Sequence, residues 1–110
     1  MSPINQLAPS DLRAWLDDAA RPQPFILDVR EPWEFAICRI TGSVPIPMNQ
    51  LISQWPELDA QKPTVVVCHH GMRSLQVSLF LARNGFAEVH NLRGGVAAWA
   101  DEVDPAMARY

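Results

Sequence analysis

The sequence has few cysteines and no excess of basic residues, and both shortages exclude classes of protein. Only two of the 110 residues are cysteines, Cys38 and Cys68, which is too few for the disulfide scaffold of a small secreted domain. The expected location is therefore the reducing cytoplasm. Nine basic against twelve acidic residues give a net charge of −3, whereas a nucleic-acid-binding domain usually carries a basic face. We therefore expect no nucleic-acid partner.

Long apolar runs are also missing. No stretch approaches the roughly 20 residues of a membrane span, and the first residues show no basic segment followed by an apolar one, as a signal peptide would. We expect no membrane partner. The length of 110 residues suits one domain, and a hydrophobic fraction of 48% is typical of a globular chain. We therefore predict a single domain over residues 1–110.

Strand and helix patterns alternate along the chain. Short runs rich in strand-forming residues at 25–29 and 64–67 predict buried strands, and 89–92 predicts a last strand, while the proline-broken run at 43–46 can only be an edge strand. This alternation predicts an α/β fold with a mainly parallel sheet. The predicted helices cover 9–20, 32–38, 48–54, 74–84 and 94–103.

One cysteine stands where a thiolate would be stabilised. Cys68 follows the strand 64–67 and opens the loop CHHGMR (68–73), after which the helix 74–84 begins. Ligands of open α/β sheets bind at the carboxyl ends of the strands, and the free N–H groups of a tight loop and a helix N-terminus attract negative charge. The pattern predicts a nucleophilic Cys68 rather than a cysteine buried for packing.

The residues that follow Cys68 are candidates for binding a substrate. Gly71 permits a tight loop, and Arg73 is either a group that holds an anionic substrate or a solvated arginine. Ser74 either hydrogen-bonds the sulfur or caps the helix. Two histidines shape the pocket or are merely exposed. The predicted substrate-binding set is His69, His70, Gly71, Met72, Arg73 and Ser74.

Two charged residues lie at the same predicted rim of the sheet. Asp28 and Arg30 follow the neighbouring strand, where they either form a structural ion pair, the favoured interpretation, or help to bind substrate. Cys38 is interpreted as a buried helix residue and not as a disulfide partner of Cys68. No Cys-x-x-Cys or His-x-x-x-His spacing occurs, so we predict no metal site.

Three segments, taken together, resemble the rhodanese-domain sulfurtransferases. The loop CHHGMRS (68–74) resembles their active-site loop, and DVRE (28–31) followed by EF (34–35) resembles their N-terminal signature. NLRGGV (91–96) followed by Trp99 resembles their C-terminal signature. The order of the three segments is that of the family. The resemblance implies a five-stranded, mostly parallel sheet flanked by helices on both faces.

One segment departs from the family pattern. Residues 38–43 read Cys-Arg-Ile-Thr-Gly-Ser, where the family usually has Gly-His-Ile-Pro-Gly-Ala. The nucleophile loop is a different segment, so the assignment of Cys68 is unaffected. The local turn, however, is not expected to follow the family.

The resemblance also implies a chemical reaction. The Cys68 thiolate attacks the outer sulfur of a donor such as thiosulfate, and sulfite leaves. A nucleophilic acceptor, such as cyanide, a small thiol or a protein thiol, then removes the sulfur from the Cys68 persulfide. Neither a metal nor an organic cofactor is needed.

Two other functions remain open. One is a phosphatase or arsenate reductase, because the cell-cycle dual-specificity phosphatases share the fold of this family, but their loop has five residues between cysteine and arginine. Here four residues separate Cys68 from Arg73, which should fit a sulfur atom and crowd a phosphate. The other alternative is a non-catalytic or sulfur-carrying interaction module of the same fold.

Overall fold

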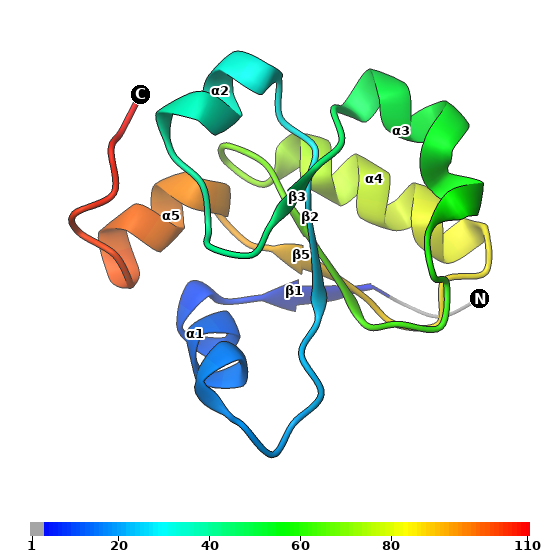
Figure 1. The fold of residues 1–110 in the computed structure, drawn as a ribbon, viewed down its shortest axis with the longest axis horizontal. Coiled ribbons are helices and arrows are strands. Elements are labelled where there is room, and N and C mark those ends of the chain that lie inside the picture. The colour runs from blue at the N-terminus through cyan, green and yellow to red at the C-terminus, as the bar shows by residue number, and fades with distance from the viewer. Residues whose placement is uncertain (1–3) are drawn as a thin grey trace.

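The computed structural model describes residues 4–110, which form one β-sheet with helices packed on both faces (Figure 1). The strands are β1 (Asn5–Leu7), β2 (Phe25–Asp28), β3 (Val44–Pro45), β4 (Thr64–Val67) and β5 (Val89–Leu92). They lie in the order β1-β5-β4-β2-β3, and every neighbouring pair is parallel. The predicted α/β fold, a five-stranded parallel sheet with helices on both faces, is confirmed.

Two pairs of helices cover the two faces of the sheet. α1 (Pro9–Asp17) and α5 (Gly95–Glu102) pack against each other on one face, while α3 (Met48–Gln54) and α4 (Met72–Arg83) cover the other (Figure 1). α2 (Pro32–Ile37) follows the carboxyl end of β2, and a 3-10 turn, η1 (Trp55–Glu57), follows α3. The carboxyl ends of β2 and β4 therefore lie side by side.

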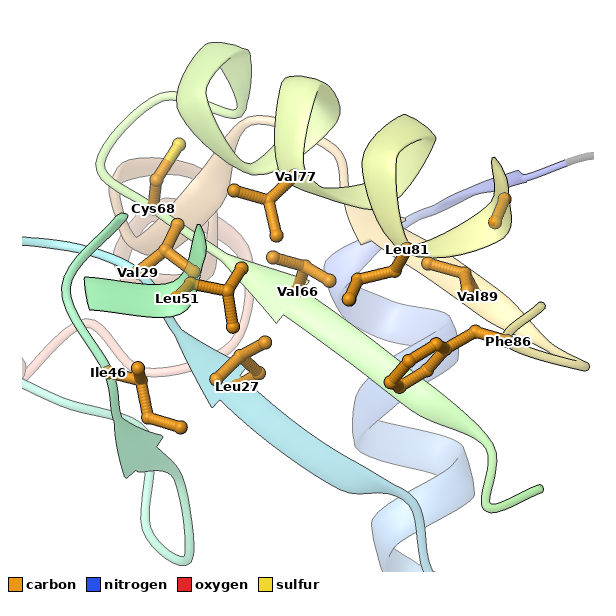
Figure 2. Packing of buried hydrophobic residues seen from close by; sticks show 11 residues of the cluster. Leu27, Val29, Ile46, Leu51, Val66, Cys68, Val77, Leu81, Phe86 and Val89 are labelled. Atoms are coloured by element: carbon orange, nitrogen blue, oxygen red, sulfur yellow. The ribbon is translucent and has the colours of Figure 1, made fainter. Parts of the chain in front are cut away.

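Side chains of the central strand β4 divide between two cores because successive residues of a strand point to opposite faces. Val66 and Cys68 lie in the core beneath α3 and α4, where Val77 and Leu81 pack against them (Figure 2). Val65 and Val67 belong to the core beneath α1 and α5. All four residues of β4 are buried, which explains why this run is β-branched and carries no charge.

The structure differs from the sequence prediction by two or more residues at the ends of two helices. α1 ends at Asp17 instead of residue 20, because the backbone of Asp18 is extended and its carboxylate accepts a hydrogen bond from the Ala20 N–H at 3.0 Å. α4 begins at Met72 instead of residue 74, directly after Gly71, which has a φ of 100°. Strand β1 was not predicted, since only its last residue is strongly apolar.

The segment that departs from the family pattern folds into a turn of its own. Gly42 has a φ of 87°, a value that favours glycine. The N–H and the hydroxyl of Ser43 both donate to the carbonyl of Ile40, at 3.1 and 2.7 Å. Ile40 itself is buried in the core beneath α1 and α5. Glycine and serine thus close the turn without the usual proline.

The contact between the Cys68 loop and the start of α5 predicts a sharp difference between two glycine substitutions. Gly95 has a φ of 61°, and a Cβ there would overlap the carbonyl oxygens of Cys68 and His69. A Cβ at Gly42 would meet no atom within 4 Å. Gly42→Ala should therefore lower the free energy of unfolding only by the backbone cost of a left-handed residue, about 1–2 kcal/mol. We predict that Gly95→Ala lowers the free energy of unfolding in urea by clearly more. Equal losses would contradict the close approach.

Candidate active site

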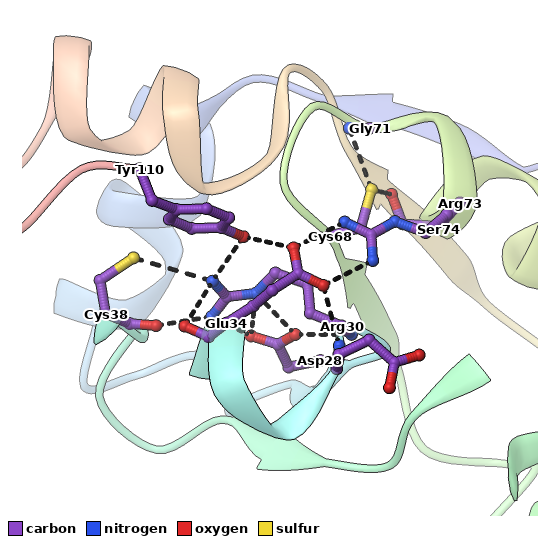
Figure 3. A network of polar contacts seen from close by, with 10 residues as sticks. Asp28, Arg30, Glu34, Cys38, Cys68, Gly71, Arg73, Ser74 and Tyr110 are labelled. Carbon is purple, nitrogen blue, oxygen red and sulfur yellow. Dashed lines mark hydrogen bonds and ion pairs between the residues drawn. The ribbon is translucent and has the colours of Figure 1, made fainter. Parts of the chain in front are cut away.

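The sulfur of Cys68 is enclosed by the loop that follows β4. The residue is 1% exposed, and its Sγ accepts a hydrogen bond from the Gly71 N–H at 3.0 Å (Figure 3). Gly71 can turn its N–H inward because it adopts a φ of 100°. A side chain would not fit here, since a Cβ would lie 3.1 Å from the Gly94 nitrogen. Of the amides of residues 69–73, that of Gly71 makes a hydrogen bond to the sulfur.

Ser74 contacts the sulfur and does not cap the helix. Its Oγ lies 3.2 Å from Cys68 Sγ, whereas Gly71 precedes α4 and no side chain caps that helix. The Ser74 hydroxyl donates to Asn91 Oδ1 at 2.5 Å, and the Asn91 amide donates to the Gly71 carbonyl at 3.2 Å and to Gln6 Oε1 at 2.9 Å. Asn91 therefore joins the two groups that contact the sulfur.

The two loop histidines form a stack with Tyr110. The His69 and His70 rings lie 3.9 Å apart at 27°, and Tyr110 lies 3.9 Å from the other side of His69 at 19°. Burial, and then the charge of His70, lowers the pKa of His69, so this ring is mostly neutral at pH 7. The three rings line a cavity of about 130 Å³ together with residues of α5.

Arg73 is paired with a carboxylate from another part of the chain. Its Nη1 and Nη2 donate to Glu34 Oε1 and Oε2 at 2.7 and 2.9 Å (Figure 3). These hydrogen bonds are the main reason that the pKa of Glu34 falls to about 2. Hydrogen bonding to Glu34 raises the pKa of Arg73, and the charge of Cys68 raises it further. The arginine charge beside the sulfur is thus largely compensated.

Asp28 and Arg30 form a buried ion pair. Arg30 Nη2 lies 2.8 Å from Asp28 Oδ2, and the two side chains are 0% and 1% exposed. The remaining Arg30 donors reach the carbonyls of Cys38 and Glu34 at 2.6 and 3.3 Å and the Tyr110 hydroxyl at 3.1 Å. This geometry matches the structural interpretation, because every guanidinium nitrogen already has a protein partner.

Cys38 is a free thiol that lines the same cavity as His69 and His70. It directly follows α2, is 9% exposed, and its Sγ lies 3.7 Å from Arg30 Nη1. Both cysteines are free. Met72, the remaining predicted site residue, is 68% exposed and begins α4 at the outer edge of the loop.

Three residues of the site had no assigned role in the sequence analysis. Glu34 and Asn91 belong to the quoted signature segments, so the signal was available, although the spacing gave no reason to pair them with the Cys68 loop. Tyr110 stands outside every motif. In residues 4–110, no three His, Cys, Asp or Glu side chains are grouped as metal ligands, and no helix there is long and apolar enough to cross a membrane.

The low pKa of Glu34 predicts how Glu34→Gln alters the pH dependence of stability. The folded-state pKa of about 2 lies below the ordinary value of 4.5, so ionised Glu34 stabilises the fold above pH 4.5 and this stabilisation is lost as the pH falls toward 2. Glutamine keeps one acceptor and removes the charge. Urea unfolding should show wild type more stable at pH 7, with the difference shrinking below pH 4.5. A difference that is constant with pH would contradict the ion pair.

Comparison with known proteins places this geometry in a family. The chain matches the model of the rhodanese-like domain over residues 8–102. It is 30% identical over 105 residues to a sulfurtransferase of Allochromatium vinosum, with 96% of each chain covered. It is 31% identical over 96 residues to the thiosulfate sulfurtransferase GlpE of Pseudomonas aeruginosa, covering 87% of this chain and 84% of GlpE.

A solved structure and two longer relatives agree. A rhodanese-related protein of Thermoplasma volcanium superposes with a TM-score of 0.79 and 31% identity, over 90% of this chain and 93% of that one. The chain spans 38% of rhodanese-like/PpiC domain-containing protein 12 of Arabidopsis thaliana and 26% of the probable adenylyltransferase/sulfurtransferase MoeZ of Mycobacterium tuberculosis. The chain belongs to the rhodanese-like domain family.

Proposed function

We propose that this protein is a sulfurtransferase that carries sulfane sulfur on Cys68, from thiosulfate or a similar donor to a nucleophilic acceptor such as cyanide or a thiol. The observation that carries the proposal is the environment of the Cys68 sulfur, which has the Gly71 N–H at 3.0 Å and the Ser74 hydroxyl oxygen at 3.2 Å. Relatives named sulfurtransferase support it.

The reaction proceeds in two balanced steps. In the first, the Cys68 thiolate attacks the outer sulfur of thiosulfate, a new S–S bond forms, and the donor S–S bond breaks. Sulfite leaves with the electron pair of that bond, and Cys68 keeps a persulfide. In the second, the acceptor attacks the outer sulfur of the persulfide, and the Cys68 thiolate is restored. Cyanide would give thiocyanate.

The loop would stabilise negative charge on sulfur in both steps. A backbone N–H fixed in advance toward a developing charge costs no reorganisation at the moment of reaction. The Gly71 N–H has this position, and the Ser74 hydroxyl can turn its proton from Asn91 toward the sulfur when the thiolate forms. Arg73 adds positive charge that Glu34 moderates.

The charge and length of the loop favour sulfur transfer over phosphoryl transfer. A phosphoryl dianion needs strong cationic stabilisation, yet both terminal nitrogens of Arg73 donate to Glu34. Only four residues separate Cys68 from Arg73, one fewer than in the phosphatases. A non-catalytic interaction module would not need a sulfur held between the Gly71 N–H and the Ser74 hydroxyl.

Mass spectrometry after brief treatment with thiosulfate tests the proposal directly. We predict that the intact protein gains the mass of one sulfur atom and that added cyanide removes it. Cys38→Ser should behave like wild type, whereas Cys68→Ser should gain nothing, because a neutral hydroxyl is a far weaker nucleophile than a thiolate.

Two outcomes would contradict the proposal. Sulfur on Cys38→Ser and Cys68→Ser in equal amounts would mean that thiosulfate modifies either cysteine without selection. No gain in wild type, together with hydrolysis of an aryl phosphate that depends on Cys68, would favour the phosphatase alternative.

A further inference from the structure

Tyr110 contacts the Cys68 loop and the Glu34 carboxylate at the same time. Its ring stacks on His69 with a centroid separation of 3.9 Å, and the edge of Trp33 meets the ring at 5.6 Å. Its hydroxyl donates to Glu34 Oε2 at 2.6 Å and accepts from Arg30 Nη1 at 3.1 Å (Figure 3). One side chain thus joins His69, which follows Cys68, to the carboxylate that pairs with Arg73.

The segment before Tyr110 is fixed to α5 by its own contacts. The Asp104 N–H donates to the Trp99 carbonyl at 2.9 Å, and the Met107 N–H donates to the Asp104 carbonyl at 3.0 Å. Arg109 pairs with Asp101 and also donates to the carbonyl of Ala100 at 3.1 Å. The position of the Tyr110 ring therefore does not depend on its contacts with the loop alone.

We propose that Tyr110 is a positioning residue for the Cys68 loop, holding His69 through its ring and the Glu34–Arg73 pair through its hydroxyl. The catalytic part of this inference rests on the proposed sulfur transfer, whereas the contacts of Tyr110 with the loop are independent of it. They restrain both ends of the five-residue stretch 69–73, and the Gly71 N–H that contacts the sulfur lies between those ends.

The hydroxyl is suited to this role at neutral pH. Burial, and then the hydrogen bond to Glu34, raises the pKa of Tyr110 to about 12, so the phenol keeps its proton and donates it. The Arg73 donors and the Glu31 N–H complete the hydrogen bonds of the Glu34 carboxylate. Removing the phenol oxygen would remove one of the donors to Glu34 and one of the acceptors of Arg30.

Two substitutions separate the two contacts. Tyr110→Phe keeps the ring and removes the hydroxyl, and Tyr110→Leu removes both. We predict that single-turnover persulfide formation at saturating thiosulfate slows about fivefold in Tyr110→Phe, as for one lost hydrogen bond. In Tyr110→Leu it should slow by about tenfold to a hundredfold, because a loop shifted by about 1 Å misplaces the donor groups. The half-saturating thiosulfate concentration should stay unchanged.

Two further measurements do not depend on sulfur transfer. The rate of Cys68 alkylation by iodoacetamide should change in Tyr110→Leu, because the groups around the sulfur move. In an NMR titration, the pKa of His69 should rise toward its ordinary value in Tyr110→Leu and stay low in Tyr110→Phe, since burial is the main cause of its depression.

Trp55→Leu is the matched control. It removes an edge-to-face partner of Phe80, whose ring lies 5.8 Å away, and Trp55 belongs to the core beneath α3 and α4 instead of the loop. Its melting temperature should fall while persulfide formation, Cys68 alkylation and the His69 titration stay as in wild type.

The proposal is overturned if both Tyr110 variants keep the wild-type rates of persulfide formation and alkylation and the wild-type His69 titration, even if both melt earlier. Should Tyr110→Leu fail to fold, an unchanged rate in Tyr110→Phe would overturn the role of the hydroxyl. If wild type forms no persulfide, the proposed function fails, while alkylation and the His69 titration still decide the role of Tyr110.

Discussion

Glu34 is the residue at which four segments around the Cys68 loop meet, three through its carboxylate and one through its main-chain carbonyl. It accepts hydrogen bonds from the Glu31 N–H at the start of α2, from Arg73 at the start of α4 and from Tyr110 near the end of the chain. The main-chain carbonyl of Glu34 also accepts a hydrogen bond from Arg30, which follows β2. Without this carboxylate, Arg73 and Tyr110 would have no common partner, and the two ends of the loop would no longer be coupled.

A second ion pair, Asp28–Arg30, contacts the main chain of Glu34. Asp28 and Arg30 are fully buried, and breaking such a pair by removing one partner costs about 3–5 kcal/mol because the remaining charge is left uncompensated. The pair keeps Arg30 directed toward the main-chain carbonyls of Glu34 and Cys38. Arg30 and Arg73 are therefore each paired with a carboxylate. The groups that contact the sulfur, the Gly71 N–H and the Ser74 hydroxyl, are neutral.

The sequence was sufficient for those parts of the fold that are encoded locally. The runs 64–67 and 89–92 coincide with β4 and β5, because β-branched and other apolar residues at these positions favour a buried strand. β1 escaped prediction because an edge strand of three residues gains its stability from pairing with β5 across more than 80 residues of chain, a contact that leaves no local pattern.

The site was predictable to the same extent. Cys68, Gly71 and Ser74 lie in one short motif, and in the structure the Gly71 N–H and the Ser74 hydroxyl both contact the Cys68 sulfur. The partners that hold this motif come from far away in the chain: Glu34 is 39 residues from Arg73, and Tyr110 is 76 residues from Glu34. Such pairings depend on the packing of α2 and the last residues against the end of the sheet, which neither hydrophobic periodicity nor residue spacing encodes.

The central claim is that one sulfur atom rests on Cys68 between two separate half-reactions. Initial rates measured with thiosulfate and cyanide varied together test it most directly. The account predicts parallel lines in double-reciprocal plots, because sulfite leaves before the acceptor reacts. Lines that intersect would show that donor and acceptor must be bound together, and the Cys68 persulfide would then not be the carrier.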